Sequence, residues 1–194
     1  MSNIITLNFS SDQKKLMVGL SWDPNEKSTG VLGGLTPHNL DLSCAVFNAD
    51  LEVCDIITPL EPKREQYKGK IFHRGDSTSG GGDFEDEDVT VYLDSLQETE
   101  RDIRAMAFIV SINDRVQFSE VKNASCAFMD GINLEPFLSI DLKGLEANSN
   151  NASSQQHFVV GYVTQGEDGS WTLKNIQKPI ESLGQSAIEA AVKA

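Results

Sequence analysis

The chain has 194 residues, of which 39% are hydrophobic and 23% are charged, and its formal net charge is −13. This length and composition are typical of one large globular domain or two small ones, and they exclude a disordered or fibrous chain. The negative charge also disfavours nucleic acid as a partner, since phosphate binding needs a basic face.

Short runs of β-forming residues, separated by Gly, Asn, Asp and Pro, dominate the chain. Such runs predict strands. In chain order they cover Ile4–Phe9, Lys15–Trp22, Leu42–Asn48, Val53–Thr58, Lys70–His73, Val89–Leu93, Ala105–Ile112, Ser125–Met129, Phe137–Leu142, His157–Thr164 and Ser170–Ile176. Eleven short strands with little helix between them predict an all-β fold, an antiparallel β-sandwich of two sheets. Asp168-Gly169, between the last two runs, predicts a hairpin turn.

Two segments have helical character. Leu96–Arg104 predicts a short helix, and Pro179 can occupy the first position of a C-terminal helix. An apolar stripe on the second helix can dock a partner or pack on the chain's own sandwich, and we expect packing; it comprises Ile180, Leu183, Ala187, Ile188 and Ala191. We therefore divide the chain into a sandwich domain, residues 1–178, and a helical tail, residues 179–194, packed on the same domain.

The cysteines indicate the compartment. Cys44, Cys54 and Cys126 have no Cys-x-x-Cys spacing and lie among apolar neighbours, which predicts buried free thiols in a reducing environment. The N-terminal stretch lacks the basic start and apolar run of a signal peptide. No segment approaches 18 consecutive apolar residues, so we expect no membrane insertion. The expected localisation is cytoplasmic.

The most informative segment is residues 74–88, RGDSTSGGGDFEDED. Six carboxylates fall within the thirteen residues from Asp76 to Asp88, and Arg74 is the nearest cationic residue before them. Like charges this close repel one another unless something compensates. Calcium takes six to eight oxygen ligands from carboxylates, carbonyls and water, whereas zinc prefers Cys and His, and only His73 is adjacent.

Composition alone leaves several interpretations of this segment open. It can be a solvated acidic loop or a calcium site. The spacing does not fit an EF-hand, so a calcium site here would be built from a loop at one end of a sandwich. Gly80–Gly82 can approach a phosphate, but the phosphate-loop motifs are missing and the carboxylates would repel the ligand. The Arg-Gly-Asp tripeptide at 74–76 can serve adhesion only in an exported protein.

Residues 73–89, HRGDSTSGGGDFEDEDV, resemble the signature of the TerD family of tellurium-resistance and stress proteins, roughly H-x-G-D-N-x-x-G-x-G-D-G-D-D-E-x-I. Residues 19–23, GLSWD, resemble the family's early G-L-x-W-D, and residues 40–47, LDLSCAVF, resemble its F-D-L-D-A-S-V-F strand. Phe118, Val121 and Asn123, and then Gly169-Ser170-Trp171, match later landmarks. The resemblance covers about residues 3–178.

The resemblance implies a β-sandwich that binds calcium ions (Ca2+) through its acidic loops. Carried over residue by residue, it implies metal ligands at Asp41, Asp76, Asp83, Glu85, Asp86 and Glu87, with Asp23 as a further candidate. Ser43, Ser77 and Phe84 stand where the family has Asp, Asn and Gly. Fewer charged ligands predict weaker binding or the loss of one of two ions. The implied partners are other stress-resistance proteins of the same system.

Two functions follow for the acidic loop. The first is a non-enzymatic calcium-binding module of a stress or tellurite-resistance system, in which Ca2+ orders residues 76–88 as a structural or protein-interaction site. The alternative is a carboxylate-pair hydrolase, in which two carboxylates with separated pKa values act as acid and base. Only Phe84 and Tyr92 offer aromatic platforms nearby, and no G-x-S-x-G elbow positions a nucleophile. We therefore expect no enzyme.

Overall fold

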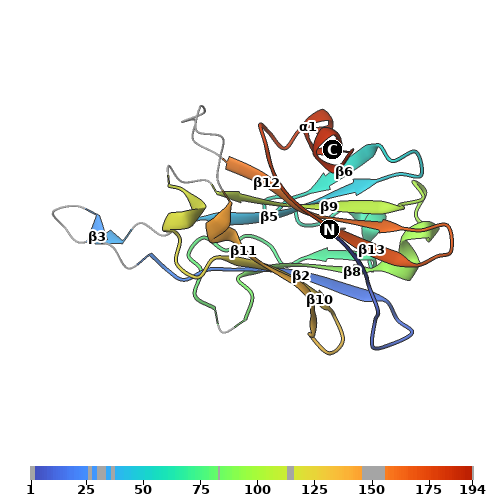
Figure 1. Ribbon diagram of the computed structural model, residues 1–194, viewed down its shortest axis with the longest axis horizontal. Coiled ribbons are helices and arrows are strands. Elements are labelled where there is room, and N and C mark those ends of the chain that lie inside the picture. Colours follow the sequence, from blue (N-terminus) through green and yellow to red (C-terminus); the bar gives the residue numbers. More distant parts are fainter. Residues whose placement is uncertain are drawn as a thin grey trace.

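The computed structural model describes residues 3–25, 28–29, 34–35, 38–82, 84–112, 116–145 and 156–193. In these residues two antiparallel sheets pack face to face, and an α-helix covers the outer side of one of them (Figure 1). This is the β-sandwich with a short C-terminal helix that the sequence predicts. The polar composition of residues 144–156 predicts a surface loop, and this segment lies almost wholly outside the described residues.

The larger sheet has six strands. In spatial order they are β1 (Ile4–Thr6), β13 (Trp171–Ile180), β12 (Gln156–Gln165), β9 (Ala105–Ile112), β5 (Leu40–Phe47) and β6 (Val53–Ile57). The β12–β13 hairpin turns at the expected Asp168-Gly169, where Gly169 has a φ of 78° and the Gly166 N–H donates to the Ser170 carbonyl at 2.8 Å.

The smaller sheet has five strands. In spatial order they are β11 (Pro136–Asp141), β10 (Ser125–Asp130), β2 (Lys15–Ser21), β8 (Glu87–Tyr92) and β7 (Ile71–His73). All eleven predicted strands are therefore confirmed, with ends that differ by up to four residues. A separate pair of two-residue strands, β3 (Ser28–Thr29) and β4 (Gly34–Leu35), was not predicted.

The main hydrophobic core lies between the two sheets. Alternate residues of β2 point into it, and the side chains of Leu16, Val18 and Leu20 are fully buried. Phe108 of β9 meets Phe128 of β10 edge to face, with ring centroids 5.4 Å apart, so the two sheets interlock at mid-strand. In β2, alternation with a period of two therefore separates core side chains from surface side chains.

Strand β9 is buried on both faces, because the C-terminal helix covers the side that faces away from the sandwich core. This helix, α1, spans Gln185–Lys193 and packs Ile188, Ala191 and Val192 against a second apolar cluster that includes Ala45 and Phe47. Of the predicted stripe, Ile188 and Ala191 pack on the chain's own sandwich, whereas Ile180 belongs to β13 and Leu183 precedes the helix.

The predicted start of this helix at Pro179 is wrong. Strand β13 continues to Ile180, with Pro179 opposite Phe158 of β12, so the expected boundary at 178/179 falls inside a strand. The other neighbour, β1, pairs with β13 at Thr172–Lys174. Pro179 lies beyond that pairing, at an edge position where its missing N–H removes no bond to β1.

The predicted helix over Leu96–Arg104 is also wrong. A 3₁₀-helix, η2, spans Leu93–Glu98 instead, and the buried residues Leu93 and Leu96 lie one 3₁₀ turn apart. Three further connections in the described part of the chain contain 3₁₀-helices with a buried residue. They are η1 (Glu65–Tyr67), η3 (Phe118–Glu120) and η4 (Leu142–Gly144). Residues three positions apart, such as Leu93 and Leu96, lie on one face of a 3₁₀-helix, which fits the tighter helix observed here.

All three cysteines are free. Cys44 and Cys126 are buried, as expected, and burial strongly raises the pKa of each thiol. The expectation of a buried thiol is wrong for Cys54, which is only half-buried because it lies on the edge strand β6. None of the helices in the described part of the chain is long and apolar enough to cross a membrane.

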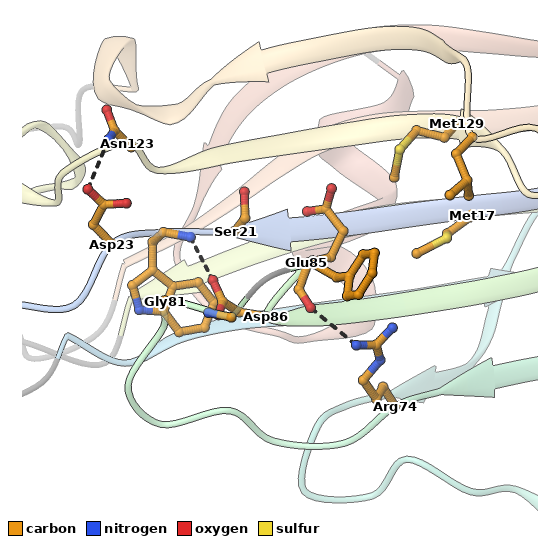
Figure 2. Close-up of a pocket in the computed structure, with 13 residues that line it drawn as sticks. Met17, Ser21, Asp23, Arg74, Gly81, Glu85, Asp86, Asn123 and Met129 are labelled. Carbon is orange, nitrogen blue, oxygen red and sulfur yellow. Dashed lines mark hydrogen bonds between the residues drawn. The ribbon is translucent and has the colours of Figure 1, made fainter.

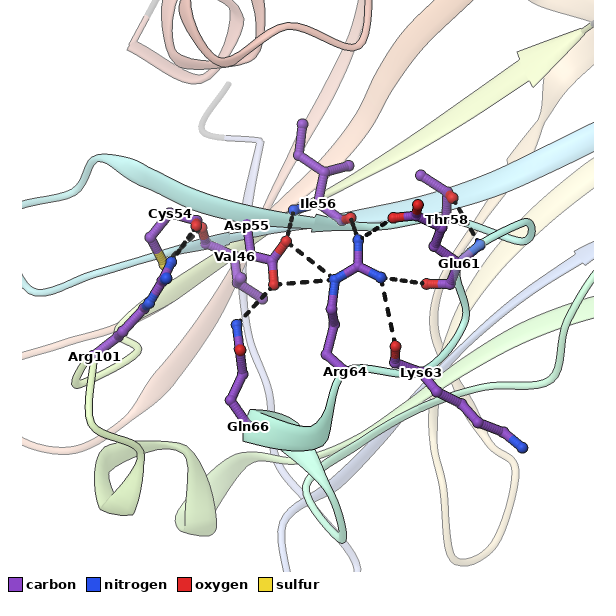
Figure 3. Close-up of polar contacts among 10 residues, drawn as sticks. All are labelled: Val46, Cys54, Asp55, Ile56, Thr58, Glu61, Lys63, Arg64, Gln66 and Arg101. Carbon is purple, nitrogen blue, oxygen red and sulfur yellow. Dashed lines mark hydrogen bonds and ion pairs between the residues drawn. The ribbon is translucent and has the colours of Figure 1, made fainter.

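Arginine side chains protect the edge strand β6 (Figure 3). Arg64 donates to the Ile56 carbonyl at 3.1 Å and pairs with the Asp55 and Glu61 carboxylates at 3.3 and 2.6 Å. Arg101 donates to the Cys54 carbonyl. Carbonyl groups of the edge strand are therefore occupied by side chains of the same molecule, which reduces the tendency of β6 to pair with a foreign strand.

Removal of the Ile188 side chain tests the role of the helix. Ile188→Ala leaves a cavity between α1 and the six-stranded sheet, so we expect the free energy of unfolding to fall by about 2–4 kcal/mol. Urea unfolding monitored by circular dichroism measures the change. Ser186→Ala, at an exposed position of the same helix, is the matched control. Equal stability of the two variants would show that α1 is not packed on the sheet.

Candidate functional site: three carboxylates where the two sheets meet

The acidic loop connects β7 to β8 and folds back on the end of β2. Gly80 and Gly81 have φ angles of 69° and 81°, which side chains other than glycine rarely adopt. A Cβ atom on Gly80 would lie 2.5 Å from the indole ring of Trp22, and the Gly81 N–H donates to the Trp22 carbonyl at 2.9 Å. The glycines therefore allow close backbone packing, as the sequence indicated.

Glu87, the first residue of β8, reaches across to the other sheet. Its side chain is fully buried, and its Oε2 accepts from the Leu42 N–H of β5 at 2.8 Å. Strand β6 begins to pair with β5 only at Cys44, so at Leu42 the carboxylate occupies the place of a strand partner. Its Oε1 accepts from the Ser77 N–H at 3.1 Å. Because the bond uses the backbone of Ser77, the departure from Asn there does not affect it.

His73 binds the same backbone unit of β5. Its Nδ1 accepts from the Gly75 N–H at 3.0 Å, so Nε2 carries the proton and donates to the Leu42 carbonyl at 2.7 Å. Burial lowers the pKa of His73, which favours this neutral form. His73 is therefore a buried residue whose two ring nitrogens both form hydrogen bonds.

Asp41, Asp76 and Glu87 converge at this point. One carboxylate oxygen from each lies within 4.8 Å of the other two. Two ligands of one calcium ion, each about 2.3–2.6 Å from it, are at most about 5 Å apart. The three oxygens therefore fit around a single hard cation. In the described part of the chain, neither Asp76 nor Glu87 forms an ion pair with Lys or Arg that would take the place of such a cation.

The crowding of negative charge affects the protonation of Glu87. Burial raises its pKa to about 8, with further contributions from Asp41 and Asp76, while the hydrogen bonds from Leu42 and Ser77 oppose the rise. Without a cation, this raised pKa favours the protonated form of Glu87. A bound cation would replace this proton, because it compensates the charge of all three carboxylates.

The other residues expected as ligands make different contacts. Asp86 accepts from the Trp22 and Gly82 N–H groups, both at 2.9 Å, and so fixes the loop to β2. Asp23 accepts from the Asn123 side chain at 2.9 Å and lies 3.5 Å from the Lys122 ammonium. Asp83 lies outside the described residues. Metal ligation by these residues stays a prediction.

Glu85 lies on the opposite side of the loop from the cluster. Its side chain crosses the outer face of β2 above Gly19, where a Cβ atom would meet Glu85 Cγ at 2.4 Å. There it lines a cavity of about 710 Å³ (Figure 2). Burial raises the pKa of Glu85, Asp86 and Asp88 raise it further, and Ser21 and Arg74 oppose the rise. Its role as a ligand also stays a prediction.

The two remaining departures from the family pattern differ in their surroundings. The Ser43 hydroxyl is buried and has no hydrogen-bond partner among the described residues, whereas Phe84 is 77% exposed. A family Asp at position 43 would lie on the same face of β5 as Asp41, two residues away. Ser43 therefore removes a charge from the neighbourhood of the cluster, while Phe84 adds apolar surface to the loop.

Comparison with known proteins identifies relatives over most of the chain. The TerD domain family model matches residues 3–183. Tellurium resistance protein TerX of Serratia marcescens is 29% identical over 193 residues, which cover 88% of this chain and 86% of TerX. TerZ of the same organism is 34% identical over 125 residues, which cover 62% of each chain and so less than two thirds of TerZ.

Stress proteins and a solved structure are also similar. General stress protein 16U of Bacillus subtilis (strain 168) is 29% identical over 136 residues, which cover 66% of this chain and 65% of that one. The crystal structure of a homologue of the telluride resistance protein TerD from Streptomyces coelicolor A3(2) has a TM-score of 0.64 and 21% identity, covering 88% and 92% of the two chains. At this identity the structural likeness establishes the fold.

The raised pKa of Glu87 predicts a pH-dependent stability in the presence of a chelator. Between the ordinary pKa of 4.5 and the folded value of about 8, the folded state holds a proton that the unfolded state has lost. The stabilisation of the folded state by this proton is fully present below pH 4.5 and is lost as the pH rises through about 8. Glu87→Gln should abolish the decline. His73 has the opposite effect on stability, because its pKa is lowered in the folded state. Its contribution is present above the ordinary pKa of 6.5 and is lost as the pH falls through the folded pKa.

The measured quantity is therefore the difference in urea midpoint between wild type and Glu87→Gln from pH 5 to pH 8. We expect the wild type to lose stability relative to the variant over this range. Parallel pH profiles would contradict the assignment of Glu87 as a buried, charge-crowded carboxyl group.

Proposed function

The chain belongs to the TerD family, and on this premise we propose that it is a non-enzymatic calcium-binding module of a stress or tellurite-resistance system. Its relatives include proteins named for tellurium resistance and for the general stress response. In this proposal Ca2+ binds at Asp41, Asp76 and Glu87 and orders the loop of residues 76–88. The ordered loop serves as a structural or protein-interaction site.

The convergence of the three carboxylates is the observation that carries the proposal. Asp41 comes from β5, Asp76 from the loop and Glu87 from β8, yet their oxygens lie within 4.8 Å of one another. Bringing three like charges together costs free energy, most of all for the buried Glu87. A divalent cation offsets this cost and joins the loop to both sheets.

The donor set favours calcium over softer metals. All three groups are carboxylates, and hard oxygen ligands suit Ca2+. His73 is the nearest candidate ligand for zinc, but both of its ring nitrogens are already used by Leu42 and Gly75. Calcium also accepts carbonyl and water ligands in flexible geometry, so the backbone of the glycine-rich loop and solvent can complete its coordination.

The cluster lends little support to the alternative of a carboxylate-pair hydrolase. An acid or base must come within hydrogen-bond reach of the substrate. Glu87 is fully buried, and both of its oxygens already accept backbone N–H groups. A carboxylate held in this way is suited to positioning the loop and compensating a cation.

Adhesion through Arg74-Gly75-Asp76 is likewise disfavoured by the contacts of its charged residues. Arg74 pairs with Asp88 at 2.5 Å, and Asp76 belongs to the carboxylate cluster. The free thiols support the expected reducing compartment, in agreement with a cytoplasmic location. Other stress-resistance proteins of the same system are the proposed partners.

Thermal unfolding tests the proposed calcium site. At a free calcium concentration one hundred times the dissociation constant, binding adds about 2.7 kcal/mol of stability. For a chain of this size that corresponds to a rise in melting temperature of roughly 5–10 °C over the chelated protein. Asp76→Asn should remove most of the rise, because it removes one charge from the cluster.

Asp50→Asn provides the matched control, since it makes the same chemical change at an exposed turn. It should melt like the wild type with and without calcium. An unchanged melting temperature of the wild type across millimolar calcium would overturn the proposal. A full calcium response in Asp76→Asn would overturn the ligand assignment.

A further inference from the structure

The outer faces of the two sheets differ in their covering. Helix α1 packs on the outer face of the six-stranded sheet, whereas no helix of the described chain packs on the outer face of the five-stranded sheet (Figure 1). Exposed apolar side chains gather on and beside that second face, and they are Phe72, Phe84, Ile132 and Leu134. Two of them, Phe84 and Leu134, line one cavity, and an apolar surface of this kind can serve as a binding site.

The cavity of about 710 Å³ lies on this uncovered face. Met17 and Met129 are paired across β2 and β10, and both line the cavity together with Phe84 and Leu134. Methionine side chains are flexible and polarisable, and they suit surfaces that accommodate a partner's side chains. The cavity therefore offers an apolar wall for the carbon chain of a ligand.

Glu85 supplies the charge in this cavity. Its side chain lies over β2, between Ser21 on one side and Met17 and Met129 on the other (Figure 2). The Glu85 carboxylate therefore lies at one end of the apolar surface formed by Met17 and Met129. The absence of a side chain at Gly19 leaves the space in which Glu85 lies.

The neighbouring charged groups of the cavity already have partners. Asp86 accepts two backbone N–H groups, and Asp23 is bound by Asn123. Arg74 is the nearest cation to Glu85, but it pairs with the Asp88 carboxylate and donates to the backbone carbonyl of Glu85. Among the described residues the Glu85 carboxylate forms no ion pair.

We propose that this cavity receives a lysine or arginine side chain of a partner protein, whose carbon chain lies on Met17 and Met129 while its charged group pairs with Glu85. This inference rests on the proposed interaction role of the loop and names its surface and the chemistry of its partner. A bare metal ion would make no use of the methionine wall, and the Asp86 and Asp23 carboxylates of the cavity already accept hydrogen bonds. A lysine or arginine side chain can pack its carbon chain on the two methionines and pair its charged group with the Glu85 carboxylate.

Charge favours a basic segment of another protein over a second copy of this chain. The net charge of −13 repels a second copy and attracts basic partners. Phe84, exposed beside Glu85, can add a cation–π contact with the incoming group. The occupant is therefore a peptide segment with a lysine or arginine flanked by apolar residues.

The loop connects this surface to the carboxylate cluster. Gly82, Phe84 and Glu85 line the cavity, while Glu87, two residues further on, belongs to the cluster on the other side. Ordering of the loop by an ion would therefore hold Glu85 in position for the basic side chain. Peptide binding should be tighter with calcium than with chelator.

Methionine methyl signals in the NMR spectrum of the full chain can report occupation of the cavity. The probe is a pool of short peptides with lysine fixed at the centre and random neighbours, and a second pool carries arginine. The control pool carries acetyl-lysine, which keeps the carbon chain and removes the charge. We expect the Met17 and Met129 signals to shift with the lysine and arginine pools, while the signal of Met106, which is buried in the core, stays fixed.

Two substitutions separate specific pairing from general attraction to an acidic protein. Glu85→Gln should weaken binding of the lysine pool by about tenfold, a loss between those of an exposed and a buried ion pair. Glu167→Gln makes the same change in the exposed β12–β13 turn and should leave binding unchanged. An unshifted Met106 signal shows that each variant is folded.

Equal shifts with the acetyl-lysine pool, equal losses in both variants, or no shifts at all would overturn the inference. Each titration is run with calcium and with chelator, and calcium binding is measured separately by calorimetry. Calcium binding without peptide binding overturns this inference alone. Peptide binding without calcium binding overturns the calcium proposal alone.

Discussion

The backbone of Leu42 holds the functional end of the molecule together. Its N–H and C=O groups are bound by Glu87 and His73, two side chains from the opposite sheet, because β6 pairs with β5 only from Cys44 onwards. This arrangement closes an open strand edge, which would otherwise leave buried polar groups without partners. It also buries a carboxylate beside Asp41 and Asp76. The proposed cation would compensate the negative charge that this closure brings together.

Three successive carboxylates of the acidic loop, Glu85, Asp86 and Glu87, point to different sides of the loop and make different contacts. Glu87 points into the junction between the sheets, Asp86 binds backbone N–H groups of β2 and the loop, and Glu85 crosses the outer face of β2. These three side chains belong to consecutive residues of one loop. An ion that orders the inner side of the loop would thus also fix the outer side, where a partner is proposed to bind.

The strands could be predicted from the sequence because runs of β-forming residues are separated by Gly, Asn, Asp and Pro, as in Lys15–Trp22 before Asp23 and Pro24. The family signature also drew attention to Asp41, Asp76 and Glu87. It could not show which carboxylates converge, because that depends on a free backbone position at Leu42, which exists only once the strands are paired. The buried role of His73 and the extension of β13 through Pro179 depend on tertiary contacts in the same way. The cavity was missed because Met17 and Met129 become neighbours only through the register of β2 and β10.

The central claim is that one cation replaces the proton of Glu87 within the cluster of Asp41, Asp76 and Glu87. Calorimetric titration with calcium at pH 7, repeated in buffers with different ionisation enthalpies, counts both the ions bound and the protons released. The account predicts saturable binding with proton release in the wild type, because the pKa of Glu87 is raised in the folded protein. Glu87→Gln should bind calcium more weakly and release no proton. Absence of binding heat, or equal affinity and equal proton release in both proteins, would contradict the account.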